Sequence, residues 1–538
     1  MKIKLFLLLL IIIGFFYRLY GLSENYSFWT DENHVAIFAR AILERGKPVL
    51  ENGYSTGIYQ WLQYWLSAVS AKIFGLNEFA IRFPSVIFGV LTIWAVYLLG
   101  KELFNKKVGL LSAFLTAFLK IEILWSRQAR PYQALQFFYL LGAWFIYKLT
   151  KEEKFNWRYF TGFLTCGILA SLMHGLGLVI LITGFLYLVI SHFSWFKKWI
   201  WLAIPLGLVF SYAFRIQILS VISSLGKVNN LFYYRVFLTH NYLFLVFLAF
   251  IGWLTLFLKD KKVFLLLTVP LIIQGFAASF LLGQPFVRYF YIVFPFLVLL
   301  ASDGAIETGY WILDIWERKI DIRNWKLDIG KTGTKKDIRN QILDTGGAKT
   351  DTGNSKLDIR GKTQYPISSI QYLVSVVLIL VVVFSLWKTD KLSLFPKKVY
   401  SLNFDMQEIP EVDWKKIYGF VDQKLKQNPD SVLVSNWNDL PVWHLGEGRL
   451  DYLLRKPGKV RIEIDPVSGA VMVYSREEFE KIIKEKPAGI LVIDSWDDRI
   501  PEGVREYVKE NLKKELEIDR LYPVQPRLWP VEVYLWGM

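Results

Sequence analysis

Two acidic side chains, Asp31 and Glu32, follow shortly after the first apolar stretch of the chain. Thr30 before them is a suitable N-cap, and a helix running to about Glu44 would bury one apolar face made of Val35, Phe38, Ala41 and Ile42. Both carboxylates then lie in the first turn of a helix close to a membrane surface. A carboxylate there can take the proton from an attacking hydroxyl group, or it can simply complement the helix dipole.

Arginines stand beside two other apolar stretches, in the segments Ser126-Arg127-Gln128-Ala129-Arg130-Pro131-Tyr132 and Gln284-Pro285-Phe286-Val287-Arg288-Tyr289. A guanidinium group binds phosphate oxygens in a bidentate way, although it can also extend toward lipid headgroups. A carboxylate and arginines together suit the attack of a hydroxyl on an anomeric carbon. The carboxylate accepts the proton, and arginine stabilises the phosphate that leaves.

The elements that must position these groups are membrane spans. The chain has 538 residues, of which 54% are hydrophobic, against about 45–50% in an ordinary globular protein. Apolar runs of about 18 residues or more predict transmembrane helices. No small-residue cleavage site follows the first run, so we expect a retained span rather than a signal peptide. The candidate spans are 3–22, 83–100, 108–124, 131–149, 159–173, 176–193, 199–219, 241–258, 263–283, 287–303 and 367–387.

The lysines indicate one orientation. Lys2 and Lys4 place the N-terminus in the cytoplasm, and the short lysine-rich loops, for example those around Lys101, Lys148 and Lys197, then fall on the same side. The net charge of +16 is therefore a feature of topology rather than of nucleic-acid binding. This orientation requires a break between two helices at His174-Gly175. The loop 23–82, the arginine segments and residues 388–538 then face outward from a multi-pass plasma-membrane protein, with residues 304–366 in the cytoplasm.

Residues 304–366 contain a seven-residue repeat, with units such as LDIWERK, IDIRNWK and LDIRGKT. Recurring glycines and sparse apolar positions do not fit a coiled coil, so we expect a disordered linker before the last span, 367–387. The single cysteine, Cys166, excludes a disulfide within one chain.

Residues 388–538 show the alternating pattern of a small α/β domain. We expect strands at 431–435, 470–474, 489–494 and 531–536, and helices at 412–427, 476–485 and 501–515. Trp437, Trp443, Trp496 and Trp529 can stack on a sugar ring, but a position in the buried core is the favoured interpretation for each.

The motifs occur in a familiar order. After Asp31-Glu32 come F-G-x-x-E-x-x-x-R-x-P (starting at Phe74 and including Glu78 and Arg82), R-Q-A-R-P-Y and R-Y-F-Y-x-x-F-P. Over roughly residues 1–303, this order resembles the GT-C superfamily of glycosyltransferases. It is most similar to the polyprenyl-phosphate-mannose protein mannosyltransferase and aminoarabinose transferase group (glycosyltransferase families 39 and 83, RgtA/B/C/D-like proteins).

The resemblance implies a helical polytopic membrane protein of about 11 transmembrane helices with an outer C-terminal α/β domain. It implies an inverting hexosyl or pentosyl transfer from a polyprenyl-phosphate sugar to an acceptor hydroxyl, and the acceptor can be protein, lipid or glycan. Asp31 would be the general base, and Glu32 would orient a substrate or help to hold a divalent cation. Arg130, Arg288 and Arg127 would bind the donor phosphate, while Tyr132, Tyr289 and His174 would line the pocket.

The sequence departs from the family in one place. Pro131-Tyr132-Gln133 offers no second acid where some relatives carry one, which weakens the case for a two-carboxylate mechanism and a metal site. Glu78 and Arg82, four residues apart, are expected to pair structurally.

Two other functions stay open. A flippase or transporter of lipid-linked glycans would show broken or charged helices at mid-membrane in two related halves, and the sequence shows no such repeat. A non-catalytic scaffold would use the outer domain to bind partners.

Overall fold

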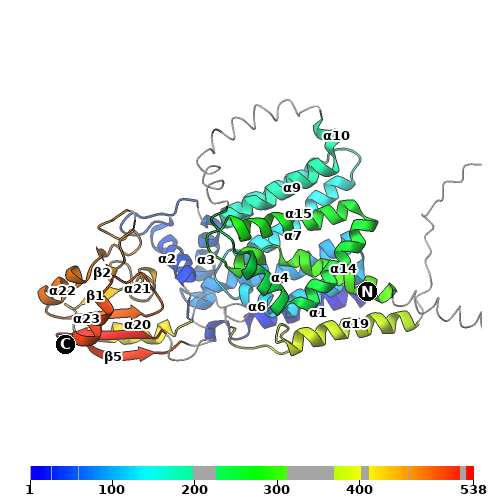
Figure 1. The fold of residues 1–538 in the computed structure, drawn as a ribbon. Coiled ribbons are helices and arrows are strands. Elements are labelled where there is room, and N and C mark those ends of the chain that lie inside the picture. Colours follow the sequence, from blue (N-terminus) through cyan, green and yellow to red (C-terminus); the bar gives the residue numbers. More distant parts are fainter. Residues whose placement is uncertain are drawn as a thin grey trace, which may run out of the picture.

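The computed structural model describes residues 2–25, 27–28, 30–58, 60–197, 212, 226–311, 369–400, 411–458, 460–520 and 529–538. The chain forms a helical bundle and a smaller α/β domain at one end of it (Figure 1). This arrangement confirms the helical protein with a C-terminal α/β domain that the sequence predicts. The predicted span 199–219 and most of the repeat segment lie outside the described residues.

The helical part is built from long apolar helices joined by short turns. In chain order its α-helices are α1 (Lys2–Leu19), α2 (Thr30–Arg45), α3 (Trp61–Phe74), α4 (Glu78–Leu103), α5 (Lys106–Phe118), α6 (Lys120–Ser126), α7 (Tyr132–Lys151), α8 (Trp157–Met173), α9 (Leu178–Ser191), α10 (Phe193–Phe196), α13 (Leu231–Val236), α14 (Leu243–Lys259), α15 (Lys261–Phe280), α16 (Val287–Tyr291), a helix over 294–311, and α19 (Ser369–Lys388).

Helix α4 packs against α1, α5 and α7. Where α14 meets the helix over 294–311, a Cβ on Gly252 would lie 2.1 Å from the carbonyl oxygen of Leu300, so this close approach needs glycine. On the outside, Leu5, Leu9 and Phe16 of α1 are exposed, as expected for side chains that meet lipid.

Among the described residues, three helices are long and apolar enough to span a membrane, namely Ile3–Glu24, Glu78–Leu103 and Lys261–Phe280. A fourth candidate, Leu231–Asn241 with Leu243–Lys259, bends by 99°. The chain is thus a membrane protein, while the count of about 11 spans stays a prediction. The expected division of 159–193 is confirmed, because α8 ends at Met173 and the short turn η2 (Gly175–Gly177) leads into α9.

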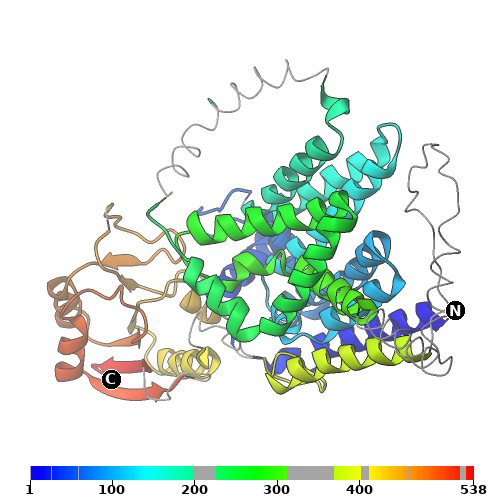
Figure 2. The ribbon, with the colours of Figure 1, turned by 45° about the vertical axis from the view of Figure 1, so that its right-hand side comes forward.

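The single span predicted for 108–124 is wrong. It divides into α5 and α6 at Leu119, which pairs as an isolated β-bridge with Leu392. The amide of Lys120 donates to the carbonyl of Lys391 at 2.9 Å, and the amide of Ser393 donates to that of Phe118 at 2.8 Å. Backbone groups of the segment after α19 therefore take the place of helical hydrogen bonds. Both views place α19 alongside α1, consistent with this contact (Figures 1 and 2).

The span predicted for 287–303 likewise divides, into α16 and the helix over 294–311. That second helix extends eight residues into the predicted linker, which therefore begins later than expected.

The C-terminal domain holds a six-stranded sheet in the order β3-β2-β1-β4-β6-β5. Strands β1 (Val432–Ser435), β2 (Tyr452–Leu454), β3 (Val471–Val473) and β4 (Gly489–Asp494) are parallel, while β6 (Val531–Trp536) runs antiparallel to β4 and to β5 (Lys513–Ile518). The helices of the domain are α20 (Trp414–Gln427), α21 (Asp439–Leu445), α22 (Arg476–Glu485) and α23 (Val504–Asn511).

The four predicted strands are confirmed as β1, β3, β4 and β6, and the predicted helices as α20, α22 and α23. The third helix was predicted to reach 515, but α23 ends at Asn511 and β5 begins at Lys513. Strands β2 and β5 and helix α21 were not predicted.

Helix α21 fixes the domain to the bundle. Val442 and Trp443 share a buried cluster with residues of α2 and α3. The Arg40 guanidinium of α2 donates to the carbonyls of Val442, at 3.1 Å, and Trp443, at 2.6 Å, and lies 4.8 Å from the Trp443 ring centre. Trp443 is therefore an interface residue rather than a sugar platform.

Candidate active site between the bundle and the C-terminal domain

The site begins at the first turn of α2, where two adjacent carboxylates have different environments. The side chain of Asp31 is about half exposed, at 46%, whereas that of Glu32 is 1% exposed. The rest of α2 is held by its apolar face, since Val35, Phe38 and Ala41 are all buried, as predicted. This packing fixes the direction in which Asp31 points.

Glu32 lies in a saturated network of hydrogen bonds. Its Oε1 accepts from Arg82 Nε at 2.9 Å and from the Ala129 amide at 2.8 Å, and its Oε2 accepts from Arg82 Nη2 at 3.0 Å. Arg82 also lies 3.5 Å from Glu78, which in turn pairs with Lys415 of the C-terminal domain at 2.7 Å. The expected pair of Glu78 and Arg82 is confirmed, with Glu32 as the closer partner of the arginine.

This network corrects the role predicted for Glu32. Its oxygens are taken up by Arg82 and the Ala129 amide, so they do not fit a bound cation or a substrate. Glu32 instead ties the turn that carries Ala129 and Arg130 to the helix that carries Asp31. Among the described residues, no group of three or more His, Cys, Asp or Glu side chains is placed to hold a metal ion.

Arg130 forms an ion pair with Asp31. Its side chain is 2% exposed, and its guanidinium lies 5.8 Å from the Trp125 ring centre and 5.3 Å from that of Tyr132. The side chain of Asp31, about half exposed, remains accessible beside this buried guanidinium.

The predicted pocket residues gather near Arg130. The Tyr132 and His174 ring centres are 5.6 Å apart, and His174 Nδ1 accepts from the Leu176 amide at 3.1 Å. Burial, with the charges of Arg130 and Arg288, lowers the pKa of His174 to about 4. Arg288 is largely buried against the ring of Phe286, 3.7 Å from its centre, and lies 5.3 Å from that of Tyr289. The positive charges of Arg130 and Arg288 therefore both act on His174.

Arg127 has a different role from the predicted one. Its fully buried guanidinium donates to main-chain carbonyls on two distant segments: those of Tyr17, Arg18, Tyr20 and Gly21, and that of Lys398. These five contacts at 2.6–3.4 Å join the end of α1 to the segment after α19. A guanidinium committed in this way is a structural connector rather than a phosphate ligand.

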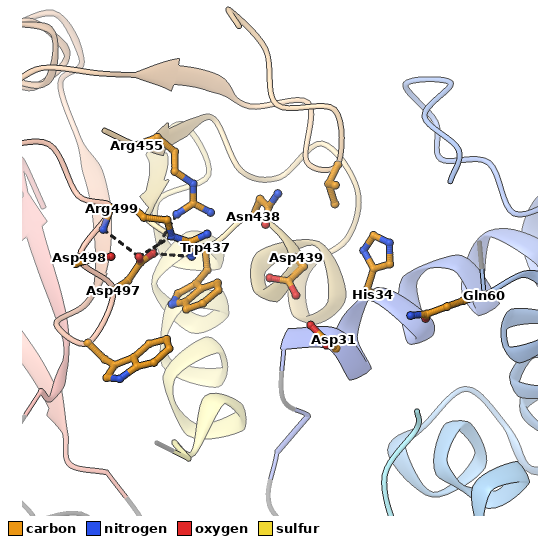
Figure 3. Close-up of a pocket in the computed structure, with 12 residues that line it drawn as sticks. Asp31, His34, Gln60, Trp437, Asn438, Asp439, Arg455, Asp497, Asp498 and Arg499 are labelled. Atoms are coloured by element: carbon orange, nitrogen blue, oxygen red, sulfur yellow. Dashed lines mark hydrogen bonds and ion pairs between the residues drawn. The ribbon is translucent and has the colours of Figure 1, made fainter. Parts of the chain in front are cut away.

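A cavity of about 850 Å³ opens beside Asp31, and most of its wall comes from the C-terminal domain (Figure 3). Asp31, His34 and Gln60 line it from the bundle, and the domain contributes Trp437, Asn438, Asp439, Arg455, Val467, Trp496, Asp497, Asp498 and Arg499. Figure 3 shows Asp31 and Asp439 directed toward each other from facing elements. Burial lowers the pKa of His34 to about 4, so its ring is neutral at physiological pH.

Sequence reasoning missed every residue that the domain contributes except Trp437 and Trp496, which were noted only as possible sugar platforms. A usable signal was present for most of them, because Trp437 to Asp439 come soon after the predicted strand 431–435 and Trp496 to Arg499 come soon after the predicted strand 489–494. Side chains at the carboxyl ends of neighbouring parallel strands meet at one edge of a sheet.

Known proteins resemble this chain in part of its sequence and in its fold. Residues 61–216 match the family of dolichyl-phosphate-mannose-protein mannosyltransferases. A segment of 160 residues is 32% identical to an uncharacterized protein of Aquifex aeolicus, covering 29% of this chain and 32% of that protein. Another of 94 residues is 30% identical to the putative mannosyltransferase YkcB of Bacillus subtilis, covering 18% of this chain and 13% of that protein. The matches thus span a third or less of these relatives.

Solved structures extend the likeness to the whole fold. ArnT from Cupriavidus metallidurans superposes with a TM-score of 0.57 at 14% identity, covering 99% of this chain and 97% of that one. The same protein has been solved bound to undecaprenyl phosphate. The oligosaccharyltransferase AglB from Archaeoglobus fulgidus, in complex with an inhibitory peptide and a dolichol-phosphate, gives 0.56 at 12% identity over 92% of this chain and 69% of that one. In motifs, matched family and fold, the chain is similar to the GT-C glycosyltransferases of membranes.

Proposed function

We propose that the protein transfers a sugar from a polyprenyl-phosphate donor to an acceptor hydroxyl, with Asp31 as the general base. The observation that carries the proposal is the ion pair between Asp31, which lines the cavity, and the buried Arg130. A proton acceptor and a phosphate-binding cation are thereby held side by side, which is the pair of groups that the reaction needs.

The transfer is a single displacement. The acceptor oxygen forms a bond to the anomeric carbon as the bond from that carbon to the phosphate oxygen breaks, so the anomeric configuration inverts. The hydroxyl proton passes to the half-exposed carboxylate of Asp31. Polyprenyl phosphate leaves with the electron pair, and Arg130 and Arg288 stabilise its charge.

A carboxylate is a weak base, and a weak base is sufficient here. The leaving phosphate departs without being protonated, so the acceptor loses its proton late in the reaction. The donor phosphate would bind beside Asp31, with Arg130 as a partner of both anions.

A lipid-linked donor agrees with two further observations. Structures of ArnT and AglB contain undecaprenyl phosphate and dolichol-phosphate. Helices α1 and α14 expose apolar side chains, and such a surface suits contact with the membrane in which this lipid resides. We place the reaction on the outer face of the membrane, because the lysine-rich loops assign Asp31 to that side.

The test is Asp31→Asn in the purified full-length protein, assayed with a panel of polyprenyl-phosphate sugars. The amide keeps the shape of the side chain but cannot accept the proton, so we expect transfer to fall by about 10²–10⁴-fold. Donor binding and the apparent melting temperature should change little. Glu44→Gln is the matched control, since it removes a half-exposed carboxylate from the far end of the same helix. Full transfer activity in Asp31→Asn would rule out this base, and a flippase or scaffold would then account better for the site.

A further inference from the structure

The topology of the C-terminal domain creates a crevice at one edge of its sheet. From β1 the chain proceeds to β2 and β3 on one side, and it then returns to β4 on the other side of β1. The loops after β1 and β4 therefore lead away from each other. In open parallel sheets, ligands bind in the crevice at the carboxyl ends of the strands where this reversal occurs.

The cavity beside Asp31 coincides with this crevice. Trp437, Asn438 and Asp439 follow β1, Arg455 follows β2, and Trp496, Asp497, Asp498 and Arg499 follow β4. The volume of about 850 Å³ is within the range of sites for small organic ligands. The crevice is therefore a binding site by topology and by size, and it opens directly onto the proposed base.

Two tryptophans provide apolar surface in this crevice. The Trp437 indole nitrogen donates to Asp494 at 2.9 Å, and the Arg499 guanidinium lies 5.0 Å from the Trp437 ring centre. The Trp496 amide donates to Asp494 Oδ1 at 2.9 Å, and its side chain remains partly exposed toward the cavity. The local contacts hold both residues in place before any ligand binds.

The charges in the crevice disfavour an anionic ligand. Asp497 accepts from Arg455 at 3.0 Å and from Arg499 at 2.7 and 3.0 Å, so both arginines are engaged by one carboxylate. Asp439 and Asp498 also line the cavity, and neither forms an ion pair with any of the described residues. A phosphate or carboxylate on the ligand would lie beside Asp498, whereas ligand hydroxyl groups can donate to the carboxyl oxygens of both residues.

Resting on the proposed function, we propose that this crevice binds the acceptor and that the acceptor presents a neutral saccharide there. The apolar face of a sugar ring packs on Trp496, and its hydroxyls donate to Asp439 and Asp498. Helix α21 carries Asp439 at its first residue and is fixed to α2 by Trp443 and Arg40. A sugar hydroxyl that donates to Asp439 therefore faces Asp31.

The experiment measures the binding of free trisaccharides to the full-length protein in lipid nanodiscs by ligand-observed NMR. The probes are neutral trisaccharides of glucose, mannose and galactose, a trisaccharide of galacturonic acid, and a neutral serine-rich peptide. We expect at least one neutral trisaccharide to bind, and the uronate and the peptide to bind at least tenfold more weakly. Trp496→Ala should raise the Kd of the neutral probe about tenfold.

Further variants make this result specific. Trp529→Ala is the matched control, because Trp529 is 45% exposed and lines a separate cavity of about 230 Å³. It should leave the Kd unchanged. Trp496→Phe keeps an aromatic ring and should bind within about threefold of the wild type. Trp496→Leu keeps apolar volume without an aromatic ring, and it replaces Trp496→Ala if the alanine variant unfolds.

The proposal is overturned if no neutral trisaccharide binds, if the uronate or the peptide binds more tightly, or if Trp496→Ala binds the neutral probe as tightly as Trp529→Ala does. Failure of the proposed function gives a different pattern. Asp31→Asn would then retain transfer activity, while neutral trisaccharides would still bind and still depend on Trp496.

Discussion

Arg82 donates two hydrogen bonds to Glu32, Nε to Oε1 at 2.9 Å and Nη2 to Oε2 at 3.0 Å, and both side chains are 1% exposed. The residue next to Glu32 is the proposed base, and the amide that Glu32 also binds belongs to the residue before Arg130. A buried ion pair is thus the link that sets the geometry of the reacting groups without touching the substrate.

Replacing Glu32 by Gln should therefore lower the stability of the protein, without a selective loss of affinity for either substrate. Removing one partner leaves the buried Arg82 charge poorly compensated, which typically costs about 3–5 kcal/mol. We expect a clear fall in the apparent melting temperature, together with similar losses in the apparent affinities for donor and acceptor. Asp31→Asn should show the reverse pattern, with activity lost and stability kept. If Glu32→Gln instead melts like the wild type, the carboxylate is not the structural link described here.

Substitutions of Arg288 and Arg127 should have different effects: the first should weaken donor binding, and the second should lower the stability of the protein. Arg288→Ala should raise the KM for the polyprenyl-phosphate sugar about tenfold to a hundredfold and change the KM for the acceptor little, because a charged hydrogen-bond donor to phosphate is lost. Arg127→Ala should lower the apparent melting temperature, since five carbonyl contacts disappear, while the folded fraction keeps its donor affinity. Equal losses for donor and acceptor in Arg288→Ala would contradict the assigned role.

Asp439 should make stability depend on pH in a defined direction. Burial raises the pKa of this carboxyl to about 7, against about 3.9 in an unfolded chain. Between these values the folded state binds more protons than the unfolded state, so the contribution of Asp439 to stability falls as the pH rises from about 4 to about 7. Asp439→Asn removes this titration. The melting temperature of the variant minus that of the wild type should therefore be larger at pH 8 than at pH 5.

Asp430→Asn is the control for that measurement, because Asp430 is an exposed carboxylate in the turn before β1. The difference in melting temperature between Asp430→Asn and the wild type should be the same at pH 5 and at pH 8. A flat difference for Asp439→Asn as well would show that Asp439 is ionised across the whole range.

The parts of the fold set by local sequence could be predicted, and the parts set by distant contacts could not. Apolar runs and helix-period patterns located α1, α4, α7 and α2, because burial of one face or contact with lipid is encoded in the residues themselves. The interruption at Leu119 has no such local cause. It depends on backbone hydrogen bonds to a segment more than 270 residues later.

The same distinction applies to the site. Asp31 and Arg130 were identifiable from motifs, but nothing in the sequence near Arg127 distinguishes a guanidinium that binds carbonyls from one that binds phosphate. Asp439 lies over 400 residues from Asp31, and only the docking of α21 on α2 brings the two together.

The packing of α21 on α2 also makes α2 a rigid connection between the two parts of the protein. The helix carries Asp31 at one end and Arg40 nine residues later, which at about 1.5 Å per residue is a separation of about 14 Å along one unbroken axis. Because Arg40 is bonded to the C-terminal domain, the helix that carries the proposed base also carries the contact that positions the crevice of that domain. Under the proposals made above, a substitution that removes the Arg40 contacts should disturb the placement of the base and that of the acceptor crevice together.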